Sequence, residues 1–439
     1  MQDRHRPESR KQRKKRRGWT LGSWLMALIT LAVIASIATV LPRLTQRQDV
    51  SAALVDTVEA WASQTARPEA TRRAATVTAA PTARPAPAVT TVPSTARGGT
   101  LTLTFGGTVA LETNVRQSGY YQDTGLYDFS DILLPAQETL QGDISLVSLE
   151  NLVVPGAKLS KLVAPAPVMR MLQRAGVRQI ALGFGRCFEQ GAAGVSSTLA
   201  AAREEGLTPF GLYASEADAA PESSVQTIGG LRVALLHGTA SLTTASSKAL
   251  RRDGRPDLVP TDDSLPERVR AAKDAGAQFV VVTVHWGSEG KTAPTKAQRT
   301  LAQKLAEAGA DIIIGYGSRR VQTAEWLFSP KPDGATRQTL CCYCLGCMLS
   351  DARESGAVAS AVVRTRVSFD PAGNVAMSQP VYTPMYLWQY KQDGATNYRL
   401  IPADQAAPDG MEQKQAQAMQ TALKNVRKAL EGSALVQGN

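Results

Sequence analysis

The stretch Phe279–Gly290 reads FVVVTVHWGSEG. Six β-branched or aromatic residues in succession predict a strand that is buried on both faces, as in a sheet covered by helices. The strand ends at His285, and Trp286, Gly287 and Glu289 follow in the loop. Because functional side chains gather in the loops at the carboxyl ends of parallel strands, His285 and Glu289 are candidate site residues.

Five further apolar runs have the same form and end in glycine or in polar residues. They read LTLTFGG, DISLVSLEN, VRQIALGFG, LRVALLHG and ADIIIGYG. Helix-like segments lie between runs of this kind, at residues 166–175, 196–205, 264–275 and 296–308. Strands that alternate with helices predict an α/β domain. Toward the end of the chain, DPAGN predicts a hairpin turn, and residues 411–430 predict a polar helix exposed to solvent.

The charge of the chain is concentrated at its beginning. The 439 residues have ordinary globular composition, 43% hydrophobic and 20% charged, with a formal net charge of +11. Nine of the Lys and Arg residues lie within residues 1–18, beside two acidic residues. An apolar segment follows directly, so membrane topology and anionic lipid account for this basic tail, and we expect no nucleic-acid partner.

The apolar segment Trp19–Pro42 reads WTLGSWLMALITLAVIASIATVLP and contains no charged residue. As a helix it would extend roughly 36 Å, enough to span a hydrocarbon core of ~30 Å once. The basic tail would then stay in the cytoplasm, and the rest of the chain would lie outside the cell membrane. The alternative is a cleaved signal peptide, because Ala35, Ser36 and Ala38 supply small residues near the end of the segment.

Composition divides the remaining chain into three parts. Residues 43–99 become rich in Ala, Thr and Pro, with too little bulky apolar content to pack, and predict a disordered linker. Residues 100–403 hold the alternating pattern of the α/β domain. Residues 404–439 are expected to form a polar C-terminal helix and tail.

Two histidines are available to the outer domain, His237 and His285, because His5 lies in the basic tail. We expect His237, in VALLHGTA, to be a buried histidine with satisfied hydrogen bonds. His285 ends a strand, and Glu150 ends another in SLVSLEN. Imidazole and carboxylate groups are ligands of zinc, manganese and iron, so the two residues predict a shared metal. A His–Glu pair that only stabilises the fold accounts for the spacing equally well.

Six motifs follow one another in an order that is found in a known family. They read FGGTVAL, YDFSDILLP, SLEN, RMLQRAGVRQIALGFGRCFEQG, VHWGSEG with PTKAQRTLAQKLAEAGADIIIGYGSRRVQ, and YCLGCML. Together they resemble the capsule-synthesis CapA family of poly-γ-glutamate synthesis proteins, from about Leu101 to Pro402. The resemblance implies a calcineurin-like, metallophosphatase-like layered α/β sandwich. It also implies poly-γ-glutamate or capsule as the polymer and membrane-bound synthetase subunits as partners.

The motifs depart from the family where its metal ligands lie. The replaced positions are Gly107 for the first aspartate, Ser148 for the asparagine before Leu-Glu, Phe184, Gly185 and Arg186 for Asn-Asn-His, Glu189 for the next aspartate, and Gly317 and Arg319, or Tyr316 after a shift of one, for the histidines of Gly-His-His-Pro-His. Glu150, His285 and Glu289 are unchanged. A dinuclear centre needs more deprotonated ligands than these, so we expect no resident metal or other cofactor, unless a replacement site for one divalent ion exists.

Two of the replacements, Arg186 and Arg319, bring permanent positive charge to positions where the family holds cations. Such guanidinium groups predict a cleft that binds carboxylate or phosphate, with Glu189 beside them. In the alternative, the two arginines simply pair with Glu150 and Glu189.

The cysteines form an unusual group. Four lie in CCYCLGC and one in the Arg186 loop: Cys341, Cys342, Cys344, Cys347 and Cys187. Alternation along a strand places Cys341 and Cys342 on opposite faces, so the four cannot all converge. The family arrangement implies that Cys187 meets Cys344 or Cys347, and outside the cell a disulfide is the first expectation. A Cys/His metal site with His285, or buried free thiols, are the alternatives.

Three functions are compatible with these residues. The first is a membrane-anchored, extracytoplasmic subunit that binds or helps to make or export an anionic envelope polymer, without metal hydrolysis of its own. The second is a hydrolase of phosphoester or polymer bonds that uses Glu150, His285 and Glu289, with His285 as general acid or base. The third is a structural module that the linker holds close to the cell wall.

Overall fold

The computed structural model describes residues 98–254, 259–331, 334–354, 356–392 and 394–438, all within the compact unit Thr91–Asn439. The predicted basic tail, the predicted span Trp19–Pro42 and the linker up to residue 97 lie outside the described residues. Within the described ranges, no helix combines the length and the apolar character that crossing a membrane requires.

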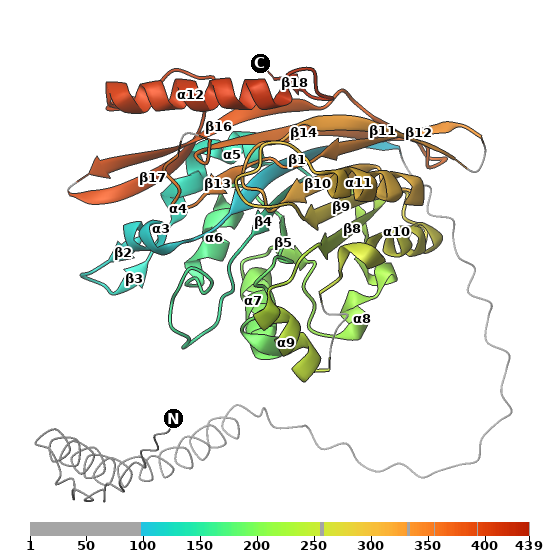
Figure 1. Ribbon diagram of the computed structural model, residues 1–439, viewed down its shortest axis with the longest axis horizontal. Coiled ribbons are helices and arrows are strands. Elements are labelled where there is room, and N and C mark those ends of the chain that lie inside the picture. Colours follow the sequence, from blue (N-terminus) through green and yellow to red (C-terminus); the bar gives the residue numbers. More distant parts are fainter. Residues whose placement is uncertain (1–97, 255–258, 332–333, 355, 393, 439) are drawn as a thin grey trace, which may run out of the picture. The chain divides into compact units, whose positions relative to one another are not determined.

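The described chain builds two large sheets and one small hairpin (Figure 1). The path through the ten-stranded sheet is β17 (Ala395–Pro402), β16 (Val381–Gln392), β14 (Ala359–Phe369), β1 (Gly99–Val109), β4 (Ile144–Leu149), β5 (Gln179–Ala181) and β6 (Thr208–Phe210). Beside this path, β13 (Cys347–Leu349) pairs with β1, β15 (Val375–Met377) with β14 and β18 (Val436–Gln437) with β16. The six-stranded sheet runs β11 (Ala324–Pro330), β12 (Thr336–Cys342), β10 (Ile312–Tyr316), β9 (Phe279–His285), β8 (Leu231–Thr239) and β7 (Val225–Ile228). The hairpin is β2 (Tyr120–Tyr121) with β3 (Leu126–Tyr127).

Helices and short turns connect the strands. In chain order they are α3 (Thr113–Ser118), α4 (Ser130–Leu133), η1 (Leu134–Ala136), α5 (Gln137–Leu140), α6 (Pro167–Arg174), α7 (Gly191–Glu204), α8 (Glu216–Ala219), η2 (Pro221–Ser224), α9 (Thr244–Arg252), η4 (Asp262–Ser264), α10 (Leu265–Asp274), α11 (Lys296–Ala308) and α12 (Gln413–Leu430). The start of α11 is set by a capping box between Thr295 and Gln298, and its end by Gly309 at a φ of 116°.

The two large sheets pack face to face, and β9 shows how its sequence serves both of its faces. Phe279 and Val281 belong to the core cluster that also contains the inward residues of β1, β4 and β14. Val280 and Val282 point the other way, into a second cluster with α10 and α11. Period-two alternation of bulky apolar residues therefore fills both the layer between the sheets and the layer under the helices.

The predicted strands and the mixed α/β class are confirmed, since every one of the six apolar runs contains a strand of the structure. The predicted hairpin at DPAGN is also present, because Phe369 pairs with Val375 across it. The alternating pattern did not predict the long antiparallel strands β16 and β17, which extend the ten-stranded sheet.

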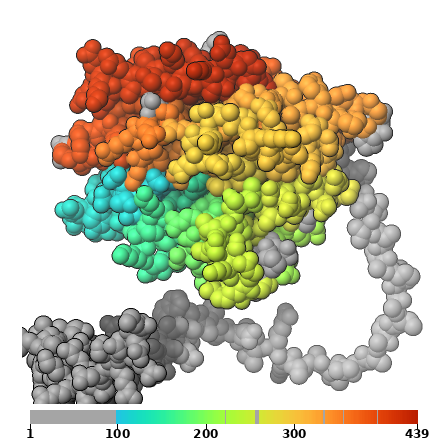
Figure 2. All heavy atoms as spheres, viewed as in Figure 1, coloured from blue at the N-terminus to red at the C-terminus, as the bar shows by residue number. Residues whose placement is uncertain are grey.

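The prediction of a solvent-exposed C-terminal helix is wrong in one respect. The helix α12 lies along β16 and β14, and the space-filling view shows it as a layer above the orange strands (Figures 1 and 2). Its residues Met419, Ala422 and Val426 are fully buried in the core. They recur at positions i, i+3 and i+7, so a polar composition conceals one apolar face.

Candidate functional site

The candidate site lies where strands of both sheets end. Glu150 directly follows β4 of the ten-stranded sheet, and His285 is the last residue of β9 in the six-stranded sheet. Arg319 follows β10, the parallel neighbour of β9. The face-to-face packing of the two sheets brings these three side chains together, although 169 positions separate Arg319 from Glu150 in the chain.

Glu150 is the centre of the site, with contacts on both carboxylate oxygens. Its Oε1 lies 3.4 Å from Nε2 of His285. Its Oε2 accepts hydrogen bonds from Nε of Arg319, at 3.2 Å, and from Nη2 of the same guanidinium. The Glu150 side chain is 8% exposed and that of Arg319 20% exposed. The ion pair is therefore nearly buried, and two nitrogens of the guanidinium donate to the same carboxylate oxygen.

Two more carboxylates contact the free side of the guanidinium. Nη1 of Arg319 lies 3.2 Å from Oε1 of Glu112 and 3.7 Å from Oε1 of Glu289. Glu289 is 75% exposed, so it adds little energy, whereas Glu112 is 15% exposed and also accepts a hydrogen bond from the backbone N–H of Asp351. Sequence reasoning did not predict Glu112. The signal was its position three residues beyond β1, which resembles the position of Glu150 beyond β4.

The ion pair determines the protonation of its members. Burial alone would raise the pKa of Glu150, but the close contact with His285 and the charge of Arg319 outweigh burial and lower this pKa to about 2. Burial opposes the charge of Arg319 as well, yet the negative charge of Glu150 raises the guanidinium pKa above its usual value. Glu150 is therefore ionised at any physiological pH and is a poor proton donor or acceptor.

Backbone conformation presents Arg319 to the site. It has a φ of 56°, the only positive φ at a non-glycine residue in the described ranges. Gly317, two residues earlier, has a φ of 102°, and a Cβ there would lie 2.5 Å from the carbonyl oxygen of Trp286. A non-glycine residue in the left-handed region costs about 1–2 kcal/mol, so the surrounding contacts must hold this turn.

Several buried polar atoms near these strand ends have no hydrogen-bond partner among the described residues. They are Thr108 Oγ1, Ser148 Oγ, Thr239 Oγ1 and His285 Nδ1, while Glu150 Oε1 has only the 3.4 Å contact with His285 Nε2. Thr108 pairs with Ser148 in the register of β1 and β4, and Thr239 pairs with His285 in the register of β8 and β9. Each unsatisfied group costs about 1–3 kcal/mol, which a polar molecule bound there would recover.

The residues of this site do not fit a metal centre. No group of three or more His, Cys, Asp or Glu side chains suited to a metal ion occurs in the part of the chain that the structure describes. The guanidinium of Arg319 occupies the position among the carboxylates that a cation would need, and its charge repels a divalent ion.

Gly107, which the resemblance places at the first aspartate of the family motif, lies where the backbone leaves no room for a side chain. A Cβ at Gly107 would lie 2.4 Å from the carbonyl oxygen of Gly346, so no side chain fits without a backbone shift. The next residue, Thr108, is buried and its hydroxyl is unsatisfied. Thr108, one residue after the predicted position, is thus the residue at this strand end that carries a buried, unsatisfied polar group.

His237 is a structural histidine, as predicted. Its Nε2 donates to the carbonyl oxygen of Gly183 at 2.6 Å, so Nδ1 accepts from the Thr283 hydroxyl at 2.7 Å. Burial lowers its pKa to about 3, so the ring is neutral. A Cβ at Gly183 or Gly211 would lie 2.4 Å or 2.6 Å from the imidazole, which makes both glycines necessary.

The second predicted arginine, Arg186, forms its ion pair with Glu189 and not, within the described ranges, with a carboxylate of the group around Glu150. Arg186 forms a 3.0 Å ion pair with Glu189, which also accepts a hydrogen bond from Thr243. Its side chain is 49% exposed. The structure therefore contains the pairing that was the alternative to a two-arginine cleft.

The predicted disulfide is absent from the described residues, where all five cysteines are free and buried. Cys341 packs with α10 and α11, whereas Cys342 lies between the sheets, as strand alternation predicts. Cys187 packs in the core beside Phe184 and Phe188. Burial raises the pKa of Cys187, Cys342 and Cys347 to about 12, so these thiols stay protonated and are poor metal ligands.

The fold and the site define a mixed α/β domain of two facing sheets, with an Arg–Glu–His group at the strand ends. Residues 102–352 match the family model described as bacterial capsule synthesis protein PGA_cap, and the chain belongs to this family. The predicted resemblance is thereby confirmed.

Two relatives support this assignment. The chain is 29% identical over 165 residues to the capsule biosynthesis protein CapA of Bacillus anthracis, covering 37% of this chain and 39% of that protein. It is 31% identical over 129 residues to the PGA biosynthesis protein CapA of Bacillus subtilis (strain 168), covering 29% of this chain and 33% of that protein. The matched segment thus spans about two fifths or less of either relative.

A comparison of structures adds a weak match. A Staphylococcus aureus crystal structure assigned as a 5′-nucleotidase, in complex with alpha-ketoglutarate, aligns with a TM-score of 0.35 and 13% identity. The alignment covers 74% of this chain and 58% of that one. A TM-score of this size supports no conclusion about fold or activity.

Proposed function

We propose that this protein is a membrane-anchored, extracytoplasmic subunit in the synthesis or export of a capsule polymer of the poly-γ-glutamate type. Membership of the capsule synthesis family supports the involvement in capsule formation. The apolar segment Trp19–Pro42 after a basic tail supports the anchor and the outside position of the domain. Membrane-bound synthetase subunits are the partners that this position makes available.

The role we propose is binding or assistance, without metal-dependent hydrolysis by the protein itself. The observation that carries this role is the placement of Arg319 among Glu150, Glu112 and Glu289. These carboxylates are compensated by a guanidinium, which disfavours a divalent cation in their midst. The unsatisfied hydroxyls of Thr108 and Ser148 leave the site able to hold a neutral or polar group.

A deletion strain tests the proposal. Removal of the protein should lower the amount of cell-associated capsule polymer, and expression of the full chain should restore it. Expression of the His285→Gln variant at the same level should restore it equally, because an accessory subunit does not need an acid or base at this position. Unchanged polymer in the deletion strain would remove the proposed function.

One observation favours a second function, a hydrolase without metal. The Glu150 carboxylate lies 3.4 Å from His285 Nε2, an arrangement that orients an imidazole as general base. Against this, the other nitrogen, Nδ1, is buried and contacts no polar partner among the described residues. The hydrolase requires that His285→Ala abolish cleavage of a phosphodiester or peptide substrate by the purified protein while the fold persists. Cleavage that survives the substitution would exclude it.

A further inference from the structure

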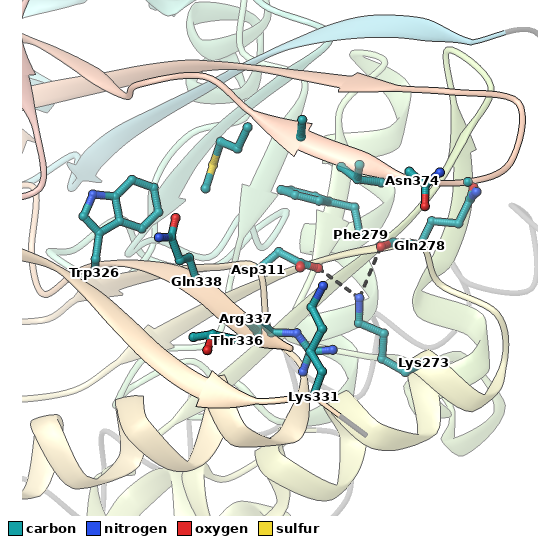
Figure 3. Close-up of a pocket in the computed structure, with 14 residues that line it drawn as sticks. Lys273, Gln278, Phe279, Asp311, Trp326, Lys331, Thr336, Arg337, Gln338 and Asn374 are labelled. Carbon is teal, nitrogen blue, oxygen red and sulfur yellow. Dashed lines mark hydrogen bonds and ion pairs between the residues drawn. The ribbon is translucent and has the colours of Figure 1, made fainter. Parts of the chain in front are cut away.

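A pocket of about 490 Å³ opens at the end of the domain opposite the Glu150 site (Figure 3). It is lined by Phe279 at the start of β9, whereas His285 ends the same strand. Seven residues of strand correspond to roughly 20 Å, so the pocket and the Glu150 site are distinct. The walls come from α10, β11, β12 and the β14–β15 hairpin, which are parts of both sheets. The volume is within the usual range for a small-molecule site, about 300–1,000 Å³.

Positive charge exceeds negative charge in the lining. Lys273, Lys331 and Arg337 contribute three cations, against the single carboxylate of Asp311. Lys273 is accounted for, because its Nζ lies 3.0 Å from Asp311 and it is in the last turn of α10. Neither Lys331 nor Arg337 forms a side-chain hydrogen bond or ion pair with any other described residue. Two cations that converge on one pocket without a partner favour an anionic ligand.

A purely structural role, in which neighbouring groups of the fold offset the charge, accounts for only part of this positive charge. Arg337 Nη1 lies 3.4 Å from the position of a Cβ at Gly309, which caps the C-terminal end of α11, so the helix dipole offsets some of its charge. Lys331 lies at the end of the β11–β12 hairpin and has no helix end of this kind. In Figure 3 its side chain extends toward the same part of the pocket as those of Lys273 and Arg337.

The remaining lining is apolar or amide-bearing. Trp326 and Gln338 lie on the side of the pocket away from the cations, and Phe279 lies above Asp311 (Figure 3). Gln338 makes no side-chain hydrogen bond with other described residues. A ligand that complements this lining therefore combines an anionic group with an aliphatic segment. Its CH2 groups would pack on the indole face of Trp326, and the side-chain amide of Gln338 would form hydrogen bonds with polar groups of its backbone.

We propose that this pocket binds a segment of an acidic polymer through its carboxylates, with Lys331 and Arg337 as the charged contacts and Trp326 as the apolar contact. Arginine suits a carboxylate through two parallel hydrogen bonds, and lysine adds a flexible point charge. The inference rests on the proposed function, because it identifies the polymer as the ligand. It adds a binding site that lies apart from the residues at the strand ends.

The test uses the full chain in detergent and a synthetic decamer of γ-linked glutamate as probe, with binding measured by calorimetry at low salt. The variant Lys331→Gln/Arg337→Gln removes the two unpaired cations. Its matched control, Lys304→Gln/Arg203→Gln, removes the same charge from two exposed positions outside the pocket, where neither side chain forms an ion pair with a described residue. A γ-linked isoglutamine decamer, in which each free α-carboxylate is replaced by a neutral carboxamide, and inorganic phosphate serve as ligand controls.

The pocket variant should bind the glutamate decamer about tenfold more weakly, since each lost charge contact weakens binding severalfold. The control variant should bind like the wild type, and higher salt should weaken binding because these contacts are exposed. Equal loss in both variants, no loss in either, equal binding of the isoglutamine decamer, or binding of phosphate alone would overturn the inference. Those results would leave the deletion-strain result untouched, so failure of the pocket and failure of the proposed function are separable.

Discussion

Nε of Arg319 donates to Oε2 of Glu150 at 3.2 Å, and this contact joins the ends of two sheets. Because both side chains are nearly buried, each compensates a charge that the protein interior would otherwise not tolerate. The pair thus has a structural role in addition to any role in binding. It also explains why the carboxylates of the site are not free for a cation.

Removal of the guanidinium should destabilise the protein strongly. Arg319→Ala leaves Glu150 buried without its partner, and we expect the free energy of unfolding to fall by about 3–5 kcal/mol. Arg186→Ala is the matched control, because it breaks an ion pair whose arginine is half exposed, and should cost less than about 1 kcal/mol. Urea unfolding of the three proteins measures the difference. Equal costs would show that the Glu150 pair is not the stabilising contact.

Two substitutions at Arg319 distinguish the cost of backbone strain from the cost of losing the charge. Because φ is 56° at this position, Arg319→Gly removes the same guanidinium but tolerates the left-handed conformation. We expect Arg319→Gly to be about 1 kcal/mol more stable than Arg319→Ala in the same urea experiment. If the glycine variant is the less stable of the two, the turn is not held in this conformation.

Glu150 should make the stability depend on pH in the acid range. Its pKa is about 2 in the folded protein and 4.5 at its ordinary value, so the unfolded chain binds the extra proton between these values. The contribution, about 3 kcal/mol, is complete above pH 4.5 and is lost as the pH falls toward 2. The difference between wild type and Glu150→Gln should therefore shrink over this window. A difference that stays constant from pH 6 to pH 2.5 would contradict the lowered pKa.

His237 should also make the protein less stable as the pH falls, but at a higher pH than Glu150. Burial lowers its pKa from 6.5 to about 3, so the unfolded chain binds a proton that the folded chain does not. The contribution of His237 to the free energy of unfolding is fully present above pH 6.5, and it falls by about 3 kcal/mol between pH 6.5 and pH 4.5. The slope of unfolding free energy against pH should flatten in His237→Gln. It should remain in His285→Gln, because that variant retains His237, and its loss there would contradict this assignment.

The thiols should be unreactive until the protein unfolds. All five cysteines are free and buried, and burial raises the pKa of Cys187 and Cys347 to about 12. An alkylating reagent should label none of them rapidly in the native protein and all five in denaturant, with no disulfide detected by mass spectrometry. A disulfide in protein purified from the cell envelope without reductant would contradict the arrangement.

Local patterns predicted much of the fold, because a strand buried on both faces has to be apolar along its whole length. The runs that became β1, β4, β8, β9 and β10 were identified in this way. The antiparallel strands β16 and β17 were not predicted, since they carry polar residues such as Gln389 and Asn397 among their apolar ones. The apolar face of α12 was not predicted for the same reason, because polar residues lie between its apolar ones.

The candidate site was predicted in part. Glu150, His285 and Arg319 were identified by their position at strand ends and by resemblance to the family, and the structure brings them together. Glu112 was missed, and Arg186 pairs with Glu189. No local pattern states which loops will meet, because that depends on the packing of one sheet against the other.

By itself, the sequence determined the class of the fold, the expectation of a buried and hydrogen-bonded His237, and the residue types available at the strand ends, because these depend on local apolar pattern and on chemistry. Only the tertiary structure decided that Arg319 neutralises Glu150 and that Lys331 and Arg337 share a pocket with Trp326. Charge pairing is set by distances between residues that are far apart in the chain, and those distances exist only once the two sheets have packed together.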